Sequence, residues 1–301
     1  MGQISSNKGE LIHFILIESN MITFDRIGYM GRLGNQMFQF ASTIGISKDL
    51  QLDARFPIEN CFNVTPSGPF NQSLGSNEMV KCDLLECFEI DQYYFIPKRH
   101  ISYTETYTET DFKYDPGTRR IKDFVNIDGY FQTEKYFLEH RDHIISQFKF
   151  KENILELARS FVESKGNHGN RLASIHIRRG DYVMYPNHHP VCSMEYYIES
   201  ILDLEFKYPG ISFLIFSDDP DWCRLNFKED KFIICDIGNP YIEMCAMSLC
   251  DDNIIANSSF SWWGAWLNTK EDKTVIAPSK WFGHMIPKDT SDVYCNKWIK
   301  K

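Results

Sequence analysis

Two arginines stand where an apolar run ends, in the stretch HIRRGD at residues 176–181. The planar guanidinium groups of Arg178 and Arg179 match the oxygens of a diphosphate, and Gly180 lets the backbone turn close to a ligand. The alternative is a solvated ion pair with Asp181, which is common at strand ends. Spacing alone leaves both interpretations open.

A second polar group, NSSFS at residues 257–261, lies where an apolar run gives way to a helical pattern. Hydroxyl and backbone N–H groups converge at the start of such a helix, where its dipole is positive. The residues that could contact a bound phosphate are Ser258, Ser259, Phe260 and Ser261. This arrangement suits a phosphate, and its alternative is an ordinary N-cap.

Two carboxylates, Asp218 and Asp219, close another apolar run. A carboxylate in that place can accept paired hydrogen bonds from the N1–H and the amine of guanine. The rival is a divalent metal, because Asp219-Pro220-Asp221 has the D-x-D spacing of a metal-binding triplet. With 41 acidic residues in the chain such a triplet arises easily by chance. We therefore predict that no metal is bound.

The turn GRLGNQ at residues 31–36 precedes a helical pattern. It is not the dinucleotide fingerprint, which needs G-x-G-x-x-G, and a Rossmann dehydrogenase is therefore disfavoured. A glycine-rich turn at a helix start could face a phosphate or a sugar, or could be only a tight loop before a capped helix.

Two other groupings are interpreted as structural. His188, His189 and Cys192 stand close together, but adjacent histidines rarely point at one metal, and we expect a loop. The tryptophans of the 257–267 stretch are expected to pack in the core and at an interface: Trp262, Trp263 and Trp266.

The elements that must hold these groups alternate between strand and helix after residue 171. Apolar runs predict strands at 172–177, 211–216, 231–237, 253–257 and 274–278. Helical periodicity predicts helices from 193, over 240–250 and from 259. Strands with little polar alternation are typical of a parallel sheet covered on both faces, which binds ligands at the carboxyl ends of its strands.

The N-terminal half opens in the same way and then becomes irregular. A strand at 22–28 precedes a helix whose apolar residues recur at helical spacing. Residues 51–130 are interpreted as loops and short elements, and 129–137 lead into a helix ending near Phe148. A further helix is expected over 152–164.

Composition limits the partners. The formal net charge of −9 argues against a nucleic acid, because phosphate contacts need a basic face, so an anionic small ligand needs a local basic pocket. Nine cysteines without paired CxxC spacing favour a reducing cytoplasm. No apolar run approaches the roughly 20 residues of a membrane helix. Residues 1–20 are interpreted as an extension or a misassigned start.

Five ordered motifs span nearly the whole chain, and together they resemble the bacterial α-1,2-fucosyltransferases of glycosyltransferase family 11. The motifs are GRLGNQMFQFA (31–41), GYFQTEKYF (129–137), HIRRGDY (176–182), FSDD (216–219) and NSSFSWWGAWL (257–267). The resemblance implies the α/β GT-B fold of two facing Rossmann-like domains. It places an acceptor-side domain at 1–150 and a domain that binds GDP-fucose at 151–301.

The resemblance also implies roles for individual residues. Arg178 is expected to bind the β-phosphate, with Asn35 and Asp181 as further catalytic candidates and Asp181 either a base or a group that orients the arginines. The other residues expected to contact substrate are Arg32, Gly34, Gln36, His176, Arg179, Asp218, Asp219, Ser258, Ser259, Phe260 and Ser261.

The implied reaction inverts C1 of GDP-β-L-fucose, with a galactose-terminated oligosaccharide or glycolipid-linked acceptor and neither metal nor cofactor. At most a peripheral association with the inner face of a bacterial membrane is expected. Transfer with another linkage, α-1,6 or to protein, and a non-catalytic nucleotide-sugar-binding module remain open alternatives.

Overall fold

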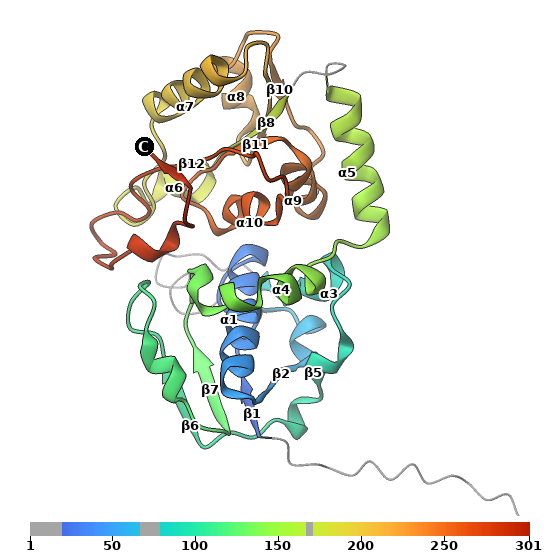
Figure 1. The fold of residues 1–301 in the computed structure, drawn as a ribbon, viewed down its shortest axis with the longest axis vertical. Coiled ribbons are helices and arrows are strands. Elements are labelled where there is room, and N and C mark those ends of the chain that lie inside the picture. The colour runs from blue at the N-terminus through green and yellow to red at the C-terminus, as the bar shows by residue number, and fades with distance from the viewer. Residues whose placement is uncertain (1–19, 67–78, 167–170) are drawn as a thin grey trace, which may run out of the picture.

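The computed structural model describes residues 20–66, 79–166 and 171–301, which form two lobes (Figure 1). The leading segment that we interpret as an extension therefore lies, up to residue 19, outside the described residues. The lower lobe is built on a five-stranded parallel sheet in the order β5-β2-β1-β7-β6. Its strands are β1 (Met21–Thr23), β2 (Asp53–Pro57), β5 (Phe95–Ile96), β6 (Glu105–Thr108) and β7 (Val125–Asp128).

The upper lobe is built on a six-stranded parallel sheet in the order β10-β9-β8-β11-β12-β13. Its strands are β8 (Leu172–Ile177), β9 (Ser212–Ser217), β10 (Phe232–Ile234), β11 (Asp252–Ile254), β12 (Val275–Ala277) and β13 (Ile299–Lys300). All six residues of β8 are buried, as expected for a central strand covered on both faces. A two-stranded antiparallel ribbon joins β3 (Thr65–Pro66) to β4 (Met79–Val80).

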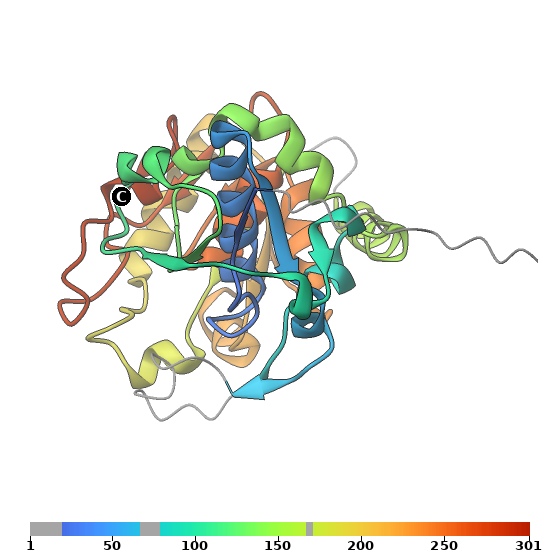
Figure 2. The same cartoon turned by 90° about the horizontal axis from the view of Figure 1, so that it is seen from below.

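Helices cover both sheets and connect the lobes. They are α1 (Leu33–Leu50), α3 (Leu84–Cys87), α4 (Arg141–Gln147), α5 (Glu152–Lys165), α6 (Gly180–Met184), α7 (Met194–Lys207), α8 (Pro220–Asn226), α9 (Pro240–Leu249) and α10 (Ser259–Leu267). Seen from below, α1 lies at the centre of the molecule (Figure 2). It packs against α10 of the upper lobe, so the two lobes share a helix–helix contact.

The predicted tryptophan cluster is the core of this contact. Trp262 and Trp263 are fully buried, and the ring of Phe38 on α1 lies 4.4 and 5.0 Å from their ring centroids. The indole of Trp262 donates to the carbonyl of Val293 at 2.7 Å, and that of Trp266 to Glu134 at 2.9 Å. The interpretation as core and interface packing is therefore confirmed.

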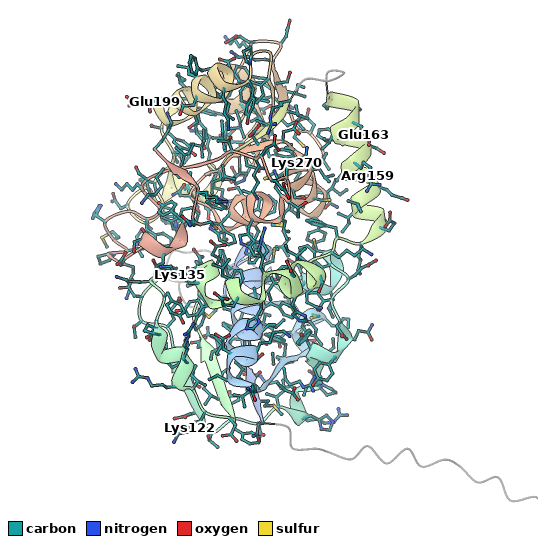
Figure 3. The ribbon with its side chains drawn as sticks, in the orientation of Figure 1. Lys122, Lys135, Arg159, Glu163, Glu199 and Lys270 are labelled. Atoms are coloured by element: carbon teal, nitrogen blue, oxygen red, sulfur yellow. The ribbon has the colours of Figure 1, made fainter. Side chains whose placement is uncertain are left out.

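Helix α5 shows how the outer surface is formed. Its buried residues are Ile154 and Ala158, and it packs against α9. Arg159 and Glu163 lie on its outer side (Figure 3). Burial on one side and charge on the other are typical of a helix that covers a sheet.

Most predicted elements of the upper lobe are confirmed, and several boundaries are corrected. The strand expected at 22–28 ends at Thr23, because a series of turns follows. The strand expected at 231–237 is limited to Phe232–Ile234, and the one at 253–257 to Asp252–Ile254. The irregular 51–130 segment supplies four of the five strands of the lower sheet, which sequence analysis did not identify.

Candidate functional site

A cleft of about 840 Å³ lies between the lobes, and residues of both line it. Arg178 and Ser217 enter it at the carboxyl ends of β8 and β9, and Thr108 and Asp128 at the ends of β6 and β7. Ligand sites of parallel sheets form in this place. Ten of the predicted site residues line the cleft: Arg32, Gly34, Asn35, His176, Arg178, Asp181, Asp218, Ser258, Ser259 and Phe260.

Arg178 is held between two carboxylates. Its guanidinium pairs with Asp218 Oδ2 at 2.9 Å and with Asp181 Oδ1, and its side chain is 18% exposed. Burial lowers the pKa of Arg178, but the charges of Asp218 and Asp181 outweigh burial and raise it, so the cation is kept. Asp218 Oδ1 also accepts the backbone N–H of Arg179 at 2.8 Å. The Asp181 side chain is 52% exposed, so its ion pair is the weaker of the two.

The N-termini of α1 and α10 meet at the cleft. A Cβ added to Gly34 would lie 2.6 Å from the backbone of both Ser259 and Phe260, so only glycine allows the two helix starts to approach this closely. Neither the N-cap of α1, Arg32, nor that of α10, Ser258, makes a side-chain cap, and neither first turn carries an acid. Two positive helix ends thus face the same space.

Three other helices of the upper lobe, α7, α8 and α9, have side-chain caps at their N-termini. Ser193 accepts the N–H of Tyr196, Asp219 that of Trp222, and Asn239 those of the first turn of α9. The uncapped N–H groups at the cleft therefore leave room for an external acceptor such as a phosphate.

Asn35 is fixed at the start of α1. Its Oδ1 accepts from Gln132 at 2.9 Å, and Gln132 accepts from the indole of Trp281 at 3.3 Å. A Cβ on Gly31 would lie 2.1 Å from Asn35 Nδ2, and the φ of Gly31 is +87°. Glycine is therefore required in this turn.

His176 lies in the wall of the cleft next to Phe260, with ring centroids 5.6 Å apart. Burial, aided by the charge of Arg178, lowers its pKa to about 3, so the ring is neutral. Its Nδ1 is buried without a protein hydrogen-bond partner among the described residues. A buried polar atom of this kind, at the surface of a cavity, fits contact with a ligand.

Four predicted site residues do not line the cleft. Gln36 is buried and holds the backbone around it, donating to Lys81 O at 2.7 Å and accepting from Asp83 N at 2.8 Å. Ser261 donates to backbone carbonyls of its own segment. Arg179 pairs with Asp219 at 2.9 Å and lies 4.1 Å from the ring of Trp222.

The acidic triplet has partners of its own. Asp219 pairs with Arg179 and caps α8, while Asp221 is 91% exposed and pairs with Arg224 at 2.6 Å. Across the described residues, no group of three or more His, Cys, Asp or Glu side chains is arranged to hold a metal ion. His188 and His189 lie in a turn, as predicted.

Glu109, Phe112, Tyr130 and Phe282 also line the cleft, and we did not predict them from the sequence. The first two lie in or next to the polar run YTETYTET, which we interpreted as a loop. Its alternation with a period of two was a strand signal, and a strand end is where site residues gather.

The sequence also led us to expectations about the cysteines and about membrane-spanning helices. All nine cysteines are free thiols, and eight are buried. Within the described ranges, no helix is both long enough and apolar enough to cross a membrane.

The family model and the relatives that match this chain are all glycosyltransferases. The model of the family "Glycosyl transferase family 11" matches residues 15–301. An α-1,2-colitosyltransferase of Escherichia coli is 32% identical over 90% of this chain and 96% of its own. The O-antigen biosynthesis glycosyltransferase WbnK of the same species is 37% identical over 59% of this chain, a match that spans 62% of WbnK.

More distant proteins share the fold. A rat galactoside α-(1,2)-fucosyltransferase 2 is 24% identical over 80% of this chain and 66% of its own. The fucosyltransferase NodZ from Bradyrhizobium superposes with a TM-score of 0.52 at 12% identity, over 82% of this chain and 92% of NodZ. POFUT1 in complex with GDP-fucose superposes with a TM-score of 0.50 at 15% identity, over 85% of this chain and 97% of POFUT1. The two lobes thus have the predicted GT-B fold.

Proposed function

Because the chain belongs to glycosyltransferase family 11, we propose that it transfers L-fucose from GDP-β-L-fucose to the 2-hydroxyl of a terminal galactose. The observation that carries the proposal is the convergence of Arg178 and two uncapped helix N-termini in one cleft between the lobes. This group of positive charges suits a nucleoside diphosphate in a chain that is acidic as a whole.

The leaving group determines what the site must stabilise. When the bond between C1 and the β-phosphate oxygen breaks, negative charge develops on GDP. Arg178 and the start of α10 are already oriented toward that position, and such preorganised groups are typically worth several kcal/mol. Asp181 is exposed, so its ion pair with Arg178 exchanges readily for a phosphate oxygen, while Asp218 keeps the guanidinium in place.

The remaining cleft residues have proposed roles on either side of the diphosphate. The neutral ring of His176, with its unpartnered Nδ1, contacts the nucleoside, and Phe260 offers a face for stacking. Arg32 and Asn35, at the start of α1, face the sugar. No divalent ion takes part, because two helix ends and Arg178 neutralise the diphosphate.

A transfer screen tests the proposal. The protein is incubated in EDTA with GDP-fucose and, in turn, lactose, N-acetyllactosamine and lacto-N-biose, and GDP release and product linkage are measured. An α-1,2-linked product is expected. Product with an α-1,6-linked fucose, or GDP binding without transfer to any of the three sugars, would replace the proposal with one of the other interpretations.

A second donor is favoured by one observation. The E. coli relative that matches 90% of this chain is named for colitose, the 3-deoxy counterpart of L-fucose. The same diphosphate site would accept GDP-colitose, so the two donors differ only in contacts to one sugar hydroxyl. Comparing kcat/KM for GDP-fucose and GDP-colitose on the same acceptor decides between them, because a site that hydrogen-bonds the 3-hydroxyl rejects the deoxy sugar.

A further inference from the structure

Part of the cleft wall carries acids from the lower lobe and aromatic rings from both lobes. Glu109 directly follows β6, and Asp128 is the last residue of β7. The ring of Phe112 stacks on Tyr130 at 5.9 Å and lies 4.7 Å from that of Phe282. Because Glu109, Asp111 and Asp128 would repel a diphosphate, this wall suits an uncharged ligand. Aromatic faces beside carboxylates provide the apolar and polar contacts that a neutral sugar needs.

Glu109 in this wall is held by two backbone N–H groups, one on each carboxylate oxygen. Its Oε2 accepts the backbone N–H of Tyr130 at 2.7 Å and its Oε1 that of Phe131 at 2.9 Å. Each oxygen keeps a further lone pair, and the side chain lines the cleft. The carboxylate is therefore fixed in orientation and able to accept one more hydrogen bond from a ligand.

Three other acids of the cleft are already held by guanidinium groups. Asp181 and Asp218 both pair with Arg178. Asp128 pairs with Arg26 at 3.3 Å. An acceptor hydroxyl would have to compete with an arginine for each of these carboxylates. Glu109 makes no ion pair with a cation among those the structure records for the described residues.

We propose that Glu109 is the general base of the transfer reaction, acting on an acceptor sugar held against Phe112, Tyr130 and Phe282. This inference rests on the proposed function. The acceptor O–H proton passes to a Glu109 oxygen as the acceptor oxygen bonds to C1 of the donor sugar. The bond from C1 to the β-phosphate oxygen breaks, and its electron pair leaves with GDP. Glu109 then returns the proton to solvent.

The environment of Glu109 is suited to accepting a proton near neutral pH. Burial raises its pKa to about 7, although the N–H groups of Phe131 and Tyr130 lower it. Asp111 raises it further and Lys288 lowers it. The charged and titratable groups that face it are Asp111, Lys288, Tyr107, Tyr130 and Tyr136. A base with a pKa near the working pH transfers protons most effectively.

The experiment compares wild type with Glu109→Gln, which keeps the size of the side chain and one of its two acceptor oxygens. Glu105→Gln is the matched control, because Glu105 lies exposed on β6, the strand that Glu109 follows. Glu243→Gln tests the rival acid, whose pKa burial also raises to about 7 in this cleft. For each protein we would measure kcat with lactose, the Kd for GDP, and kcat/KM from pH 5 to 9.

We expect Glu109→Gln to lower kcat by roughly 100- to 10,000-fold, with the Kd for GDP unchanged. In the wild type kcat/KM should fall tenfold per pH unit below about pH 7, and this acid limb should be absent from Glu109→Gln. Glu109→Asp keeps a carboxylic acid, so the acid limb of its kcat/KM profile should remain while its kcat falls. It serves as the second test if Glu109→Gln does not fold.

Three results would overturn the inference: a Glu109→Gln protein with near-normal turnover, a wild-type profile that is flat from pH 5 to 8, or an acid limb that disappears with Glu243→Gln instead. A parallel loss of GDP affinity would assign Glu109 a structural role only. If the wild type is active and Glu109→Gln is equally active, this inference is wrong and the proposed function stands. If the wild type transfers nothing, the proposed function and this inference are both wrong.

Discussion

The contact between α1 and α10 leads to a sharp prediction for Gly34→Ala. The added Cβ would lie 2.6 Å from Phe260 N and from Ser259 C, and 2.8 Å from Ser259 Oγ. The first two atoms are backbone and cannot rotate away. The start of α10 must therefore move relative to the start of α1, which is where we place the diphosphate.

The magnitude follows from the cost of overpacking. Forcing one extra carbon into a packed contact typically costs about 1–3 kcal/mol. If half of that cost falls on the bound state, the Kd for GDP rises roughly 2- to 12-fold, since about 1.4 kcal/mol corresponds to a factor of ten. The same cost should lower the melting temperature by roughly 2–5 °C in a chain of this size.

The assay is GDP titration together with thermal unfolding. Gly166→Ala is the matched control, because a Cβ there meets only ordinary contacts at 3.6 and 3.8 Å and its φ is −64°. The control should bind GDP normally and gain a few tenths of a kcal/mol of stability. A Gly34→Ala protein that melts and binds GDP like wild type would refute the proposed closeness of the two helix starts.

Three further outcomes are expected. His176 has a pKa of about 3, below its ordinary 6.5, so the unfolded state binds the extra proton as pH drops below 6.5. This group alone then lowers stability by about 2 kcal/mol at pH 5, and the melting temperature of His176→Gln should fall by less than that of wild type between pH 7 and 5. Trp263→Ala removes a fully buried ring and should cost about 3–5 kcal/mol by urea unfolding, with an unchanged m value if the native state is otherwise kept. Asp221→Asn should leave turnover in EDTA unchanged, since the side chain is 91% exposed and pairs with Arg224; loss of activity restored by Mn²⁺ would favour the metal triplet.

The central strands of the upper lobe were predictable because they are apolar along their length. Residues 172–177 are apolar in a continuous run and all six are buried, so hydrophobicity alone locates the strand. The edge strand β6 is different. Three of its four residues are exposed, and its threonine and glutamate side chains resemble a loop. Its pairing with β7 is a contact between residues 20 apart, which local sequence does not encode.

The site was predictable only at the level of segments. The motif NSSFS marks a helix start, but Ser259 lies at the cleft and Ser261 is buried, because two residues along a helix turn the side chain to another face. HIRRGD does not reveal that Arg178 faces the cleft while Arg179 packs on Trp222. Glu109 is positioned by N–H groups about 20 residues away, and no motif signals them.

The central claim is that Arg178 and the paired helix starts bind the diphosphate of GDP without a divalent ion. The most direct measurement is the Kd for GDP of wild type and Arg178→Ala, each in EDTA and in Mg²⁺. We expect equal wild-type affinity in both buffers and a loss of roughly 10- to 100-fold for Arg178→Ala, as is typical when a charged hydrogen bond is removed. Unchanged affinity in Arg178→Ala, or wild-type binding that disappears in EDTA, would contradict the claim.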